Sequence, residues 1–230
     1  MKLDALDTAK LDEAPFSAGA FRDRVLTRLN AGLPTGGTGC LSQGACLREA
    51  GDHVLNPSIF PDPSGVKLRD AAVLIPVVDR GPQASVILTR RTDHLASHAG
   101  QIAFPGGKID EGDRDATHAA LREAEEEIGL GSEFVDPIGN LGPYLTGSGY
   151  RITPVLAYVR EGFSLRPEPG EVADIFEVPL EFLMSPGNHL KLSRQWKGAR
   201  RHFYAMPYER HYIWGVTAGI LRSLYDTIYA

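Results

Sequence analysis

The stretch LREAEEEIGL, residues 121–130, places four glutamates within five positions. The alanines and leucines around them favour a helix, yet like charges three or four positions apart on a helix repel by about 0.2–0.5 kcal/mol per pair. A rotation of about 100° per residue brings Glu123, Glu126 and Glu127 onto one face, turns Glu125 away, and leaves an apolar stripe that includes Ile128. The fold must therefore place these three carboxylates where a positively charged group or ion can neutralise their negative charge.

A solvated acidic face is the ordinary interpretation of such a charge run. Two features count against it. The lysines expected four positions after the glutamates of a surface helix are missing, and the helix follows a Gly106-Gly107 turn, where a backbone can approach a ligand closely. A hard divalent cation neutralises carboxylates through oxygen ligands. We therefore predict that the helix is a platform for Mg²⁺ or Mn²⁺.

The rest of the chain from residue 71 onward predicts a mixed sheet packed between helices, which is an α/β fold. The helix is expected over 113–128, with Asp113 or Asp115 as its N-cap and Gly129 at its end. A turn, GGKIDEGD, is expected before it. Alternating or continuous apolar runs predict strands at AAVLIPVVD, SVILTRR, QIAFP, FVDPIGNLGPYL, YRITPVLAYVR and VADIFEVPL. A helical turn at EFLMS, a hairpin of KLSRQW with RRHFYAMP, and an amphipathic helix, IWGVTAGILRSLYDTIY, complete the pattern.

Residues 1–69 have a different texture from the remainder. A helical rhythm over 16–33 places Phe21, Val25, Leu26 and Leu29 on one side, and segments rich in glycine and proline follow it. We interpret 1–69 as an N-terminal helix and wrapping extension, and 70–230 as one catalytic domain.

Composition limits the partners. The net charge is −5 without a basic run, which argues against nucleic acid or an anionic membrane as the main partner. The N-terminal residues lack the apolar core of a signal peptide, and no stretch approaches the roughly 18 apolar residues of a membrane span. Cys40 and Cys46 lack companion ligands, so free thiols in a cytoplasmic protein are expected rather than a zinc site.

The stretch GGKIDEGDRDATHAALREAEEEIGL resembles the signature of the Nudix hydrolases. That signature is a glycine, five residues, an acid, a spacer, and then R-E-apolar-x-E-E-x-G-apolar, and residues 122–130 match its ending at every position. Asp113 stands where glutamate is usual, and eight residues rather than seven separate it from Arg122. The resemblance implies a Nudix α/β/α sandwich and metal-dependent hydrolysis of a nucleoside diphosphate linked to another group.

The block ILTRRTDHLASHAGQIAFPGG and the terminal IWGVTAGIL resemble the coenzyme A diphosphatase branch of that family, which shares the eight-residue spacing and the aspartate. Ala96 replaces an arginine of the branch pattern, and Thr92 a serine or alanine. The implied substrate is coenzyme A or a derivative, cut into 3′,5′-ADP and 4′-phosphopantetheine. One alternative is a Nudix pyrophosphatase for ADP-ribose, a dinucleotide or a nucleotide sugar. The other is a non-catalytic nucleotide-binding module, which would be expected to lose motif glutamates that this chain retains.

The resemblance also implies roles for the motif residues. Glu123 and Glu127 are the expected Mg²⁺ or Mn²⁺ ligands, assisted by Glu126 and by the carbonyl of Gly107. Arg122 would hold a glutamate in its coordinating rotamer. An ordinary surface ion pair with Glu126, one turn away, is the alternative role for Arg122.

A general base is also needed to activate water. Glu168 and Glu171 are available in EPGEVADIFEVPL. Glu171 precedes a strand directly after Pro169 and Gly170, so we predict that it projects into the cleft. The alternative is that both are plain loop acids.

Substrate contacts are expected beside the FPGG turn, because an acidic protein needs local positive groups to attract a polyphosphate. The candidates are Arg90, Arg91, His94, His98 and Gln101, although for each histidine taken alone an ordinary hydrogen-bonded loop residue is the better interpretation.

Other polar and aromatic groups are expected to be structural. His118 is expected to be exposed on the outer side of the helix, and residues 146–150 to form either an active-site loop or a plain hairpin turn. Trp214 and the C-terminal tyrosines are expected in the core or in a homodimer contact.

Overall fold

The computed structural model describes residues 14–30, 50–60, 67–95, 98–196 and 198–230. The side chain of Leu29 and the predictions for Cys40, Cys46 and Ala96 lie outside the described part of the chain. No helix within that part combines the length and the apolar character needed to span a membrane.

Nine of the described strands form one mixed sheet, as the sequence predicts. Its centre is β2 (Arg69–Val78), which pairs in parallel with β8 (Tyr150–Val159) along its whole length and joins β3 (Ser85–Arg91) through an antiparallel hairpin. The remaining strands are β1 (Ala50–Gly51), β4 (Ile102–Ala103), β5 (Gly106–Lys108), β6 (Val135–Asn140), β7 (Tyr144–Leu145) and β9 (Val172–Pro179). The Gly-Gly segment, expected as a turn, pairs with β2 as strand β5.

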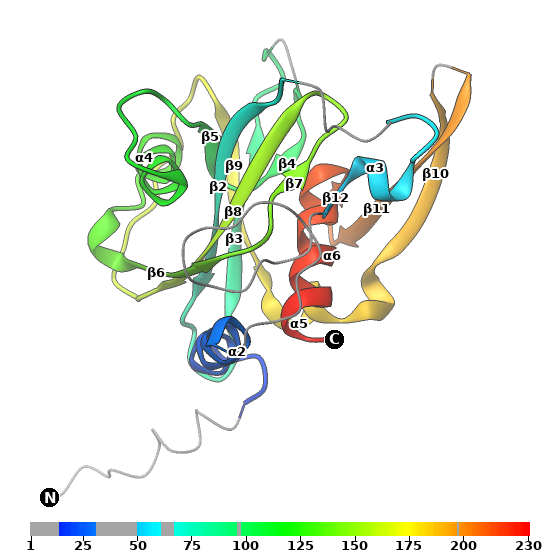
Figure 1. Ribbon diagram of the computed structural model, residues 1–230. Coiled ribbons are helices and arrows are strands. Elements are labelled where there is room, and N and C mark those ends of the chain that lie inside the picture. The colour runs from blue at the N-terminus through cyan, green and yellow to red at the C-terminus, as the bar shows by residue number, and fades with distance from the viewer. Residues whose placement is uncertain (1–13, 31–49, 61–66, 96–97, 197) are drawn as a thin grey trace, which may run out of the picture.

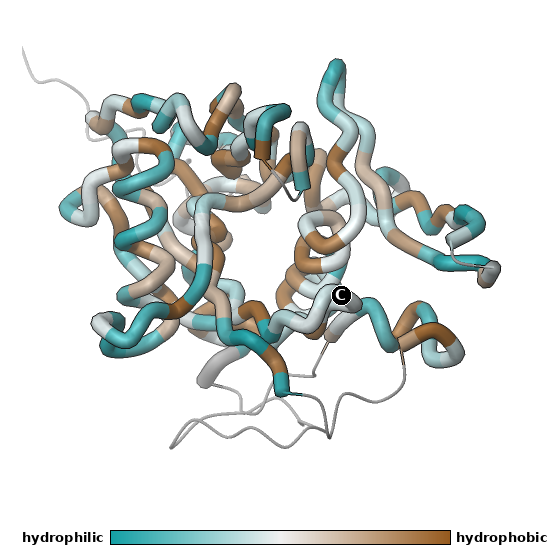
Figure 2. Tube along the Cα trace, turned by 90° about the horizontal axis from the view of Figure 1, so that it is seen from above, coloured by the Kyte–Doolittle hydropathy of each residue, from teal (hydrophilic) through white to brown (hydrophobic). Residues whose placement is uncertain are grey.

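Helices cover both faces of this sheet, so the α/β sandwich is confirmed (Figure 1). Helix α4 (Ala116–Ile128) packs on one face, while α6 (Val216–Ile228) and α2 (Ala18–Asn30) pack on the other. Ala119, Ala120 and Ala124 are fully buried, and such small side chains let α4 approach the sheet closely. Hydrophobic and hydrophilic stretches alternate along the helices, as expected of helices with one apolar side (Figure 2).

The N-terminal segment shares the core of the main sheet. Phe21 and Val25 of α2 are fully buried there, but Leu26 is 41% exposed. The buried side of α2 is therefore narrower than the apolar side that the sequence predicts. Short helices α3 (Asp52–Leu55) and α5 (Leu180–Met184) and the 3₁₀ turns η1 (Ser132–Phe134) and η2 (Pro186–Asn188) connect the larger elements.

A second, three-stranded sheet lies beyond α6. Strands β10 (Leu190–Trp196) and β11 (Ala199–Tyr208) form the predicted hairpin, and β12 (His211–Trp214) adds to β11. The residues IWG were expected to begin the terminal helix, which is wrong. Ile213 and Trp214 belong to β12, and Gly215 turns the chain at a positive φ of 68° before α6 begins.

Candidate active site

Local capping sets the register of the acidic helix α4. The carboxylate of Asp115 accepts a hydrogen bond from the backbone N–H of His118 at 2.8 Å, which confirms one of the two predicted N-caps. Gly129 ends the helix in the left-handed conformation, as predicted, at a φ of 67°. With both ends fixed, the direction of each glutamate follows from helix geometry.

The sheet, α4 and the start of α6 enclose a cavity of about 640 Å³. Glu123 and Glu127 line it from α4, and Glu171 lines it from the segment before β9. Arg91 and Lys108 supply positive charge at the same end. The cavity therefore combines carboxylates with cations, which suits a site for a metal and an anionic substrate.

Glu127 is the most deeply placed of these carboxylates. Its side chain is 4% exposed, and it accepts hydrogen bonds from the N–H of Gly106 at 3.0 Å and from Arg91 at 3.3 Å. Burial disfavours the charged form and raises the pKa of Glu127 to about 7. Burial also raises the pKa of Glu123. A cation between them would relieve this cost.

Arg122 and Asp113 lock the outer side of α4. Asp113 is 1% exposed and accepts two hydrogen bonds from Arg122, at 2.8 and 3.1 Å, which hold the pKa of Asp113 well below its usual range. The same guanidinium donates to Glu123 at 2.9 Å and to Glu126 at 3.1 Å. Arg122 thus positions Glu123, while Asp113 positions Arg122. His118 is not merely exposed, since its Nδ1 lies 2.8 Å from Asp113.

The three-glutamate face divides in the structure. Glu126 is 60% exposed and does not line the cavity, whereas Glu123 and Glu127 do. Each of the three carboxylates is paired with an arginine, Arg122 or Arg91, which accounts for the tolerated repulsion in the absence of a cation.

The donor set fits a hard cation. Glu123 packs so closely on the backbone of Gly107 that a Cβ at residue 107 would lie 2.5 Å from the carboxylate. This cradle places a carboxylate directly against backbone beside a second buried carboxylate, Glu127, and carboxylate oxygens are donors that Mg²⁺ and Mn²⁺ prefer. Among the described residues, no three His, Cys, Asp or Glu side chains already form a complete metal-binding group.

The residues predicted to contact substrate are separated by strand geometry. Arg91 lines the cavity, but Arg90 does not and instead pairs with exposed Asp93 at 3.2 Å. Successive strand residues point to opposite sides, so only one of the two arginines can enter the site. His98 and Gln101 also line the cavity, and His98 Nδ1 lies 2.9 Å from Gln101 Oε1.

Of the remaining loop residues predicted to act in the site, one lines the cavity and two do not. Glu171 enters the cavity with its carboxylate 3.9 Å from the guanidinium of Arg91. His94 is exposed and does not line the cavity. Glu168 does not line it either and accepts instead from the N–H of Gly170 at 3.4 Å.

Sequence reasoning missed three contributors to the cavity. Lys108 and Asp110 line it from β5 and the turn that follows. Trp214, expected in the core or in a dimer contact, lines it instead. The glycine that follows Trp214 was the available signal, because it marks a turn rather than the inside of a helix.

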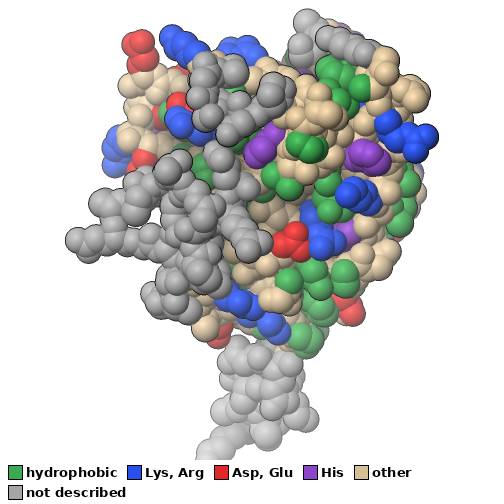
Figure 3. Space-filling view, turned by 45° about the vertical axis from the view of Figure 1, so that its right-hand side comes forward, with side chains coloured by type: hydrophobic (Ala, Val, Ile, Leu, Met, Phe, Trp, Pro, Cys, Tyr) green, Lys and Arg blue, Asp and Glu red, His purple; other side chains and the backbone are tan. Residues whose placement is uncertain are grey.

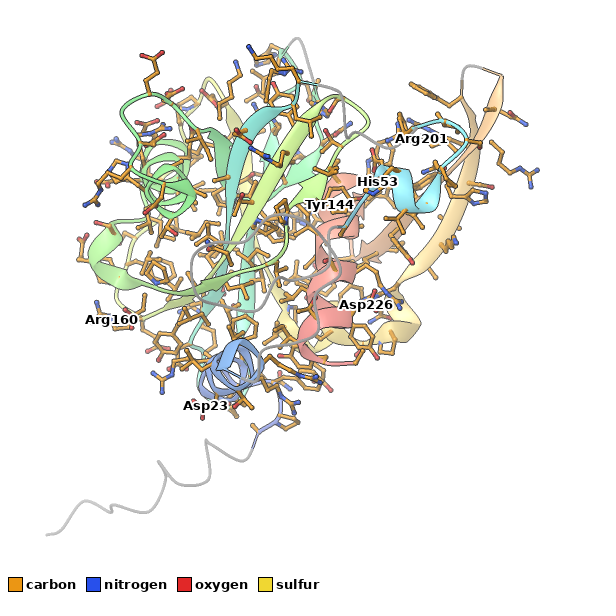
Figure 4. All side chains as sticks on the ribbon, in the orientation of Figure 1. Asp23, His53, Tyr144, Arg160, Arg201 and Asp226 are labelled. Atoms are coloured by element: carbon orange, nitrogen blue, oxygen red, sulfur yellow. The ribbon has the colours of Figure 1, made fainter. Side chains whose placement is uncertain are left out.

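Residues 146–150 form a hairpin turn between β7 and β8, and Thr146, Ser148 and Tyr150 of this turn line the cavity. Buried Asp52, from α3, holds this loop by accepting the N–H of Gly147 at 2.9 Å. Asp52 also accepts from Arg201 at 2.9 Å and from the hydroxyl of Tyr144 at 3.2 Å. Tyr144 and Arg201 lie near α3 in Figure 4.

Replacing Asp52 by alanine is expected to lower the free energy of unfolding by about 2–3 kcal/mol, because it leaves the partly buried Arg201, the hydroxyl of Tyr144 and the N–H of Gly147 without their buried partner. Chemical denaturation measures this difference. Asp93→Ala, which removes an exposed aspartate–arginine pair, is the matched control and should change stability by less than about 1 kcal/mol. Equal effects of the two substitutions would contradict the structural role of Asp52.

The stability of the metal-free protein is expected to depend on the charge of Glu127. Its folded-state pKa, about 7, exceeds the ordinary 4.5, so the native state binds this proton more tightly than the unfolded state. The resulting stabilisation is complete below about pH 4.5 and is lost as the pH rises through 7, an effect of about 2–3 kcal/mol. In EDTA, Glu127→Gln should remove this loss, whereas Glu126→Gln should keep it. Denaturant melts at pH 5 and pH 8 test the difference.

The chain is similar to several known proteins. The NUDIX domain family model matches residues 67–203. An uncharacterized Nudix hydrolase, NudL, of Yersinia pestis is 43% identical over 156 residues, which cover 68% of this chain and 78% of that protein. NudL of Yersinia pseudotuberculosis matches to the same extent. A MutT/nudix family protein from Enterococcus faecalis, a solved structure, is 16% identical with a TM-score of 0.46, covering 70% of this chain and 61% of that chain.

Proposed function

Since this chain belongs to the Nudix hydrolase family, we propose that it hydrolyses the diphosphate linkage of coenzyme A or a derivative, releasing 3′,5′-ADP and 4′-phosphopantetheine. The observation that supports a diphosphatase best is the cavity end where Glu123 lies against Gly107 and Glu127 accepts the N–H of Gly106, with Arg91 and Lys108 lining the same cavity. The block ILTRRTDHLASHAGQIAFPGG supports the choice of coenzyme A.

Nudix hydrolases generally use divalent metal cations, and Mg²⁺ or Mn²⁺ suits these oxygen donors. Glu123, Glu127 and the carbonyl of Gly107 would hold the cation, with Glu126 joining by rotation of its exposed side chain. When bound, the cation neutralises the diphosphate oxygens and acidifies a water molecule. Arg122 keeps Glu123 in place for this task through its hydrogen bond.

Glu171 is the proposed general base. It is half exposed in the cavity and can accept a proton from the attacking water. The water oxygen forms a bond to one phosphorus, the bond between that phosphorus and the bridging oxygen breaks, and the other phosphate leaves with the bridging oxygen. Arg91, between Glu127 and Glu171, orients the base and offsets the negative charge of the substrate.

A panel of coenzyme A, ADP-ribose, a dinucleoside polyphosphate and a nucleotide sugar, assayed with Mg²⁺, with Mn²⁺ and with EDTA, tests the proposal. We expect metal-dependent cleavage with coenzyme A preferred. Cleavage of ADP-ribose but not coenzyme A would favour the general pyrophosphatase alternative. Binding of these compounds without any cleavage would favour the non-catalytic module.

Coenzyme A is expected to be cut about tenfold to a hundredfold faster than dephospho-coenzyme A at low substrate, because a charge-assisted bond to the 3′-phosphate contributes about 1.5–3 kcal/mol. Lys108 is the best-placed partner, since it lines the cavity and no carboxylate among the described residues pairs with it. Lys108→Met should reduce the preference, and Lys67→Met, an exposed lysine outside the cavity, should not. Equal rates for the two wild-type substrates would show that the 3′-phosphate is not read.

A further inference from the structure

The cavity has a second end whose chemistry differs from the carboxylate end. It is walled by Ile102, Phe104, Ile152, Trp214, Val216 and Ile220. Thr217 also lines the cavity, and its hydroxyl is already used as a donor to the carbonyl of Ile102 at 2.8 Å. The wall made of these six side chains therefore offers mainly apolar surface to a ligand.

Trp214 is held in place by two neighbours that do not line the cavity. The guanidinium of Arg194 lies 4.8 Å from its ring centroid, and the ring of Phe203 meets it nearly edge-on at 5.5 Å. Neither Arg194 nor Phe203 lines the cavity, whereas Trp214 does. The indole surface presented to the cavity is thus the part that these neighbours leave uncovered.

Such an arrangement is ready to bind a flat ring. A preorganised aromatic side chain loses little conformational entropy on binding, and stacking on a nucleobase does not depend on hydrogen-bond partners. The pantetheine half of coenzyme A carries two amides that need such partners, which this wall lacks. The adenine of the nucleotide half matches the wall better.

We propose that Trp214 is a nucleobase-stacking residue that binds the adenine of the substrate, which places the diphosphate at Glu123 and Glu127 and the base at the start of α6. This assignment rests on the proposed function. Neighbouring charge supports it. Lys191, Arg194 and Arg200 are exposed on the β10–β11 hairpin, and Arg194 lies over the ring of Trp214. Lys and Arg side chains are scattered over the face of the molecule seen in Figure 3, and this positive charge favours approach of an anionic nucleotide.

Fluorescence tests the assignment without catalysis, because the chain has two tryptophans. Trp196→Phe leaves Trp214 as the reporter, and Trp214→Phe leaves Trp196. In EDTA, 3′,5′-ADP should change the emission of the Trp196→Phe variant saturably, and 4′-phosphopantetheine should not. The Trp214→Phe variant should give no such change. A saturable change caused by 4′-phosphopantetheine would overturn the assignment. So would the absence of any change with either product.

Kinetics supply a second test that separates binding from a structural role. Trp214→Leu should raise KM for coenzyme A by about tenfold to a hundredfold with kcat within about threefold, and Trp214→Phe should recover most of the loss. Loss of kcat in both variants would indicate a structural role and overturn the proposal.

The two proposals fail in different ways. If wild type cuts coenzyme A but Trp214→Leu leaves KM unchanged, the stacking assignment fails and the proposed function stands. If wild type cuts no coenzyme A while 3′,5′-ADP still changes Trp214 emission, the proposed substrate fails and the stacking site stands.

Discussion

Glu127→Gln is expected to lower turnover by more than about a hundredfold while the protein remains folded. The substitution keeps the shape of the side chain and leaves an oxygen that can accept the N–H of Gly106, but it removes the buried charge that would bind the cation. Loss of groups that merely orient metal ligands costs about tenfold to a hundredfold, so loss of a ligand itself should cost more. Steady-state kinetics at saturating Mg²⁺, with circular dichroism of the variant, measure both parts of the prediction.

The same helix supplies the controls. Glu125→Gln should be nearly silent, since Glu125 is exposed on α4 and does not line the cavity. Glu126→Gln separates two views of the site. A large loss of turnover would mean that the exposed side chain of Glu126 rotates to the cation. A small loss would mean that Glu126 serves only to pair with Arg122. Glu127→Gln with nearly wild-type activity would rule out the ligand assignment.

Local signals made α4 predictable. Asp115 and Gly129 cap it through contacts within a few residues, and the direction of each glutamate then follows from helical rotation. The sequence therefore indicated that Glu123 and Glu127 share a face. The sequence did not reveal that only part of this face lines the cavity. Glu126 lies outside the cavity, because the position of the cavity edge depends on how α4 packs against β5.

Tertiary packing decided the features that the sequence left open. The sequence gives no reason to distinguish Arg90 from Arg91. The pairing of β3 with its neighbours decides that Arg91 points into the cavity. Asp113 reads as a possible cap, but the fold buries it beneath Arg122. Asp52 lies 95 residues before the loop that it holds, so no local pattern could connect them.

Alanine substitutions at Gly106 and Gly107 are expected to have opposite effects. One should lower the stability of the fold, and the other should lower turnover. At Gly107, the three atoms nearest an added Cβ all belong to the carboxylate of Glu123, at 2.5–2.7 Å, and that carboxylate ends a flexible side chain. Gly107→Ala should therefore fold normally, displace Glu123 from its cradle, and lower turnover by about a hundredfold or more, in line with a disturbed metal ligand.

At Gly106, the same added atom would meet backbone, since the carbonyl oxygen of Ala72 lies 2.4 Å away and the Cα of Val73 lies 2.6 Å away. Backbone of the central strand cannot move aside cheaply, and Gly106 has a positive φ of 152°. Gly106→Ala should therefore lower the free energy of unfolding by more than about 2 kcal/mol. Gly112→Ala is the matched control, because a Cβ there meets nothing within 4 Å, and it should leave both stability and turnover unchanged. If Gly107→Ala kept full turnover, the close approach of Glu123 to this backbone would have no part in catalysis. If it unfolded the protein as Gly106→Ala should, the cradle would be structural rather than functional.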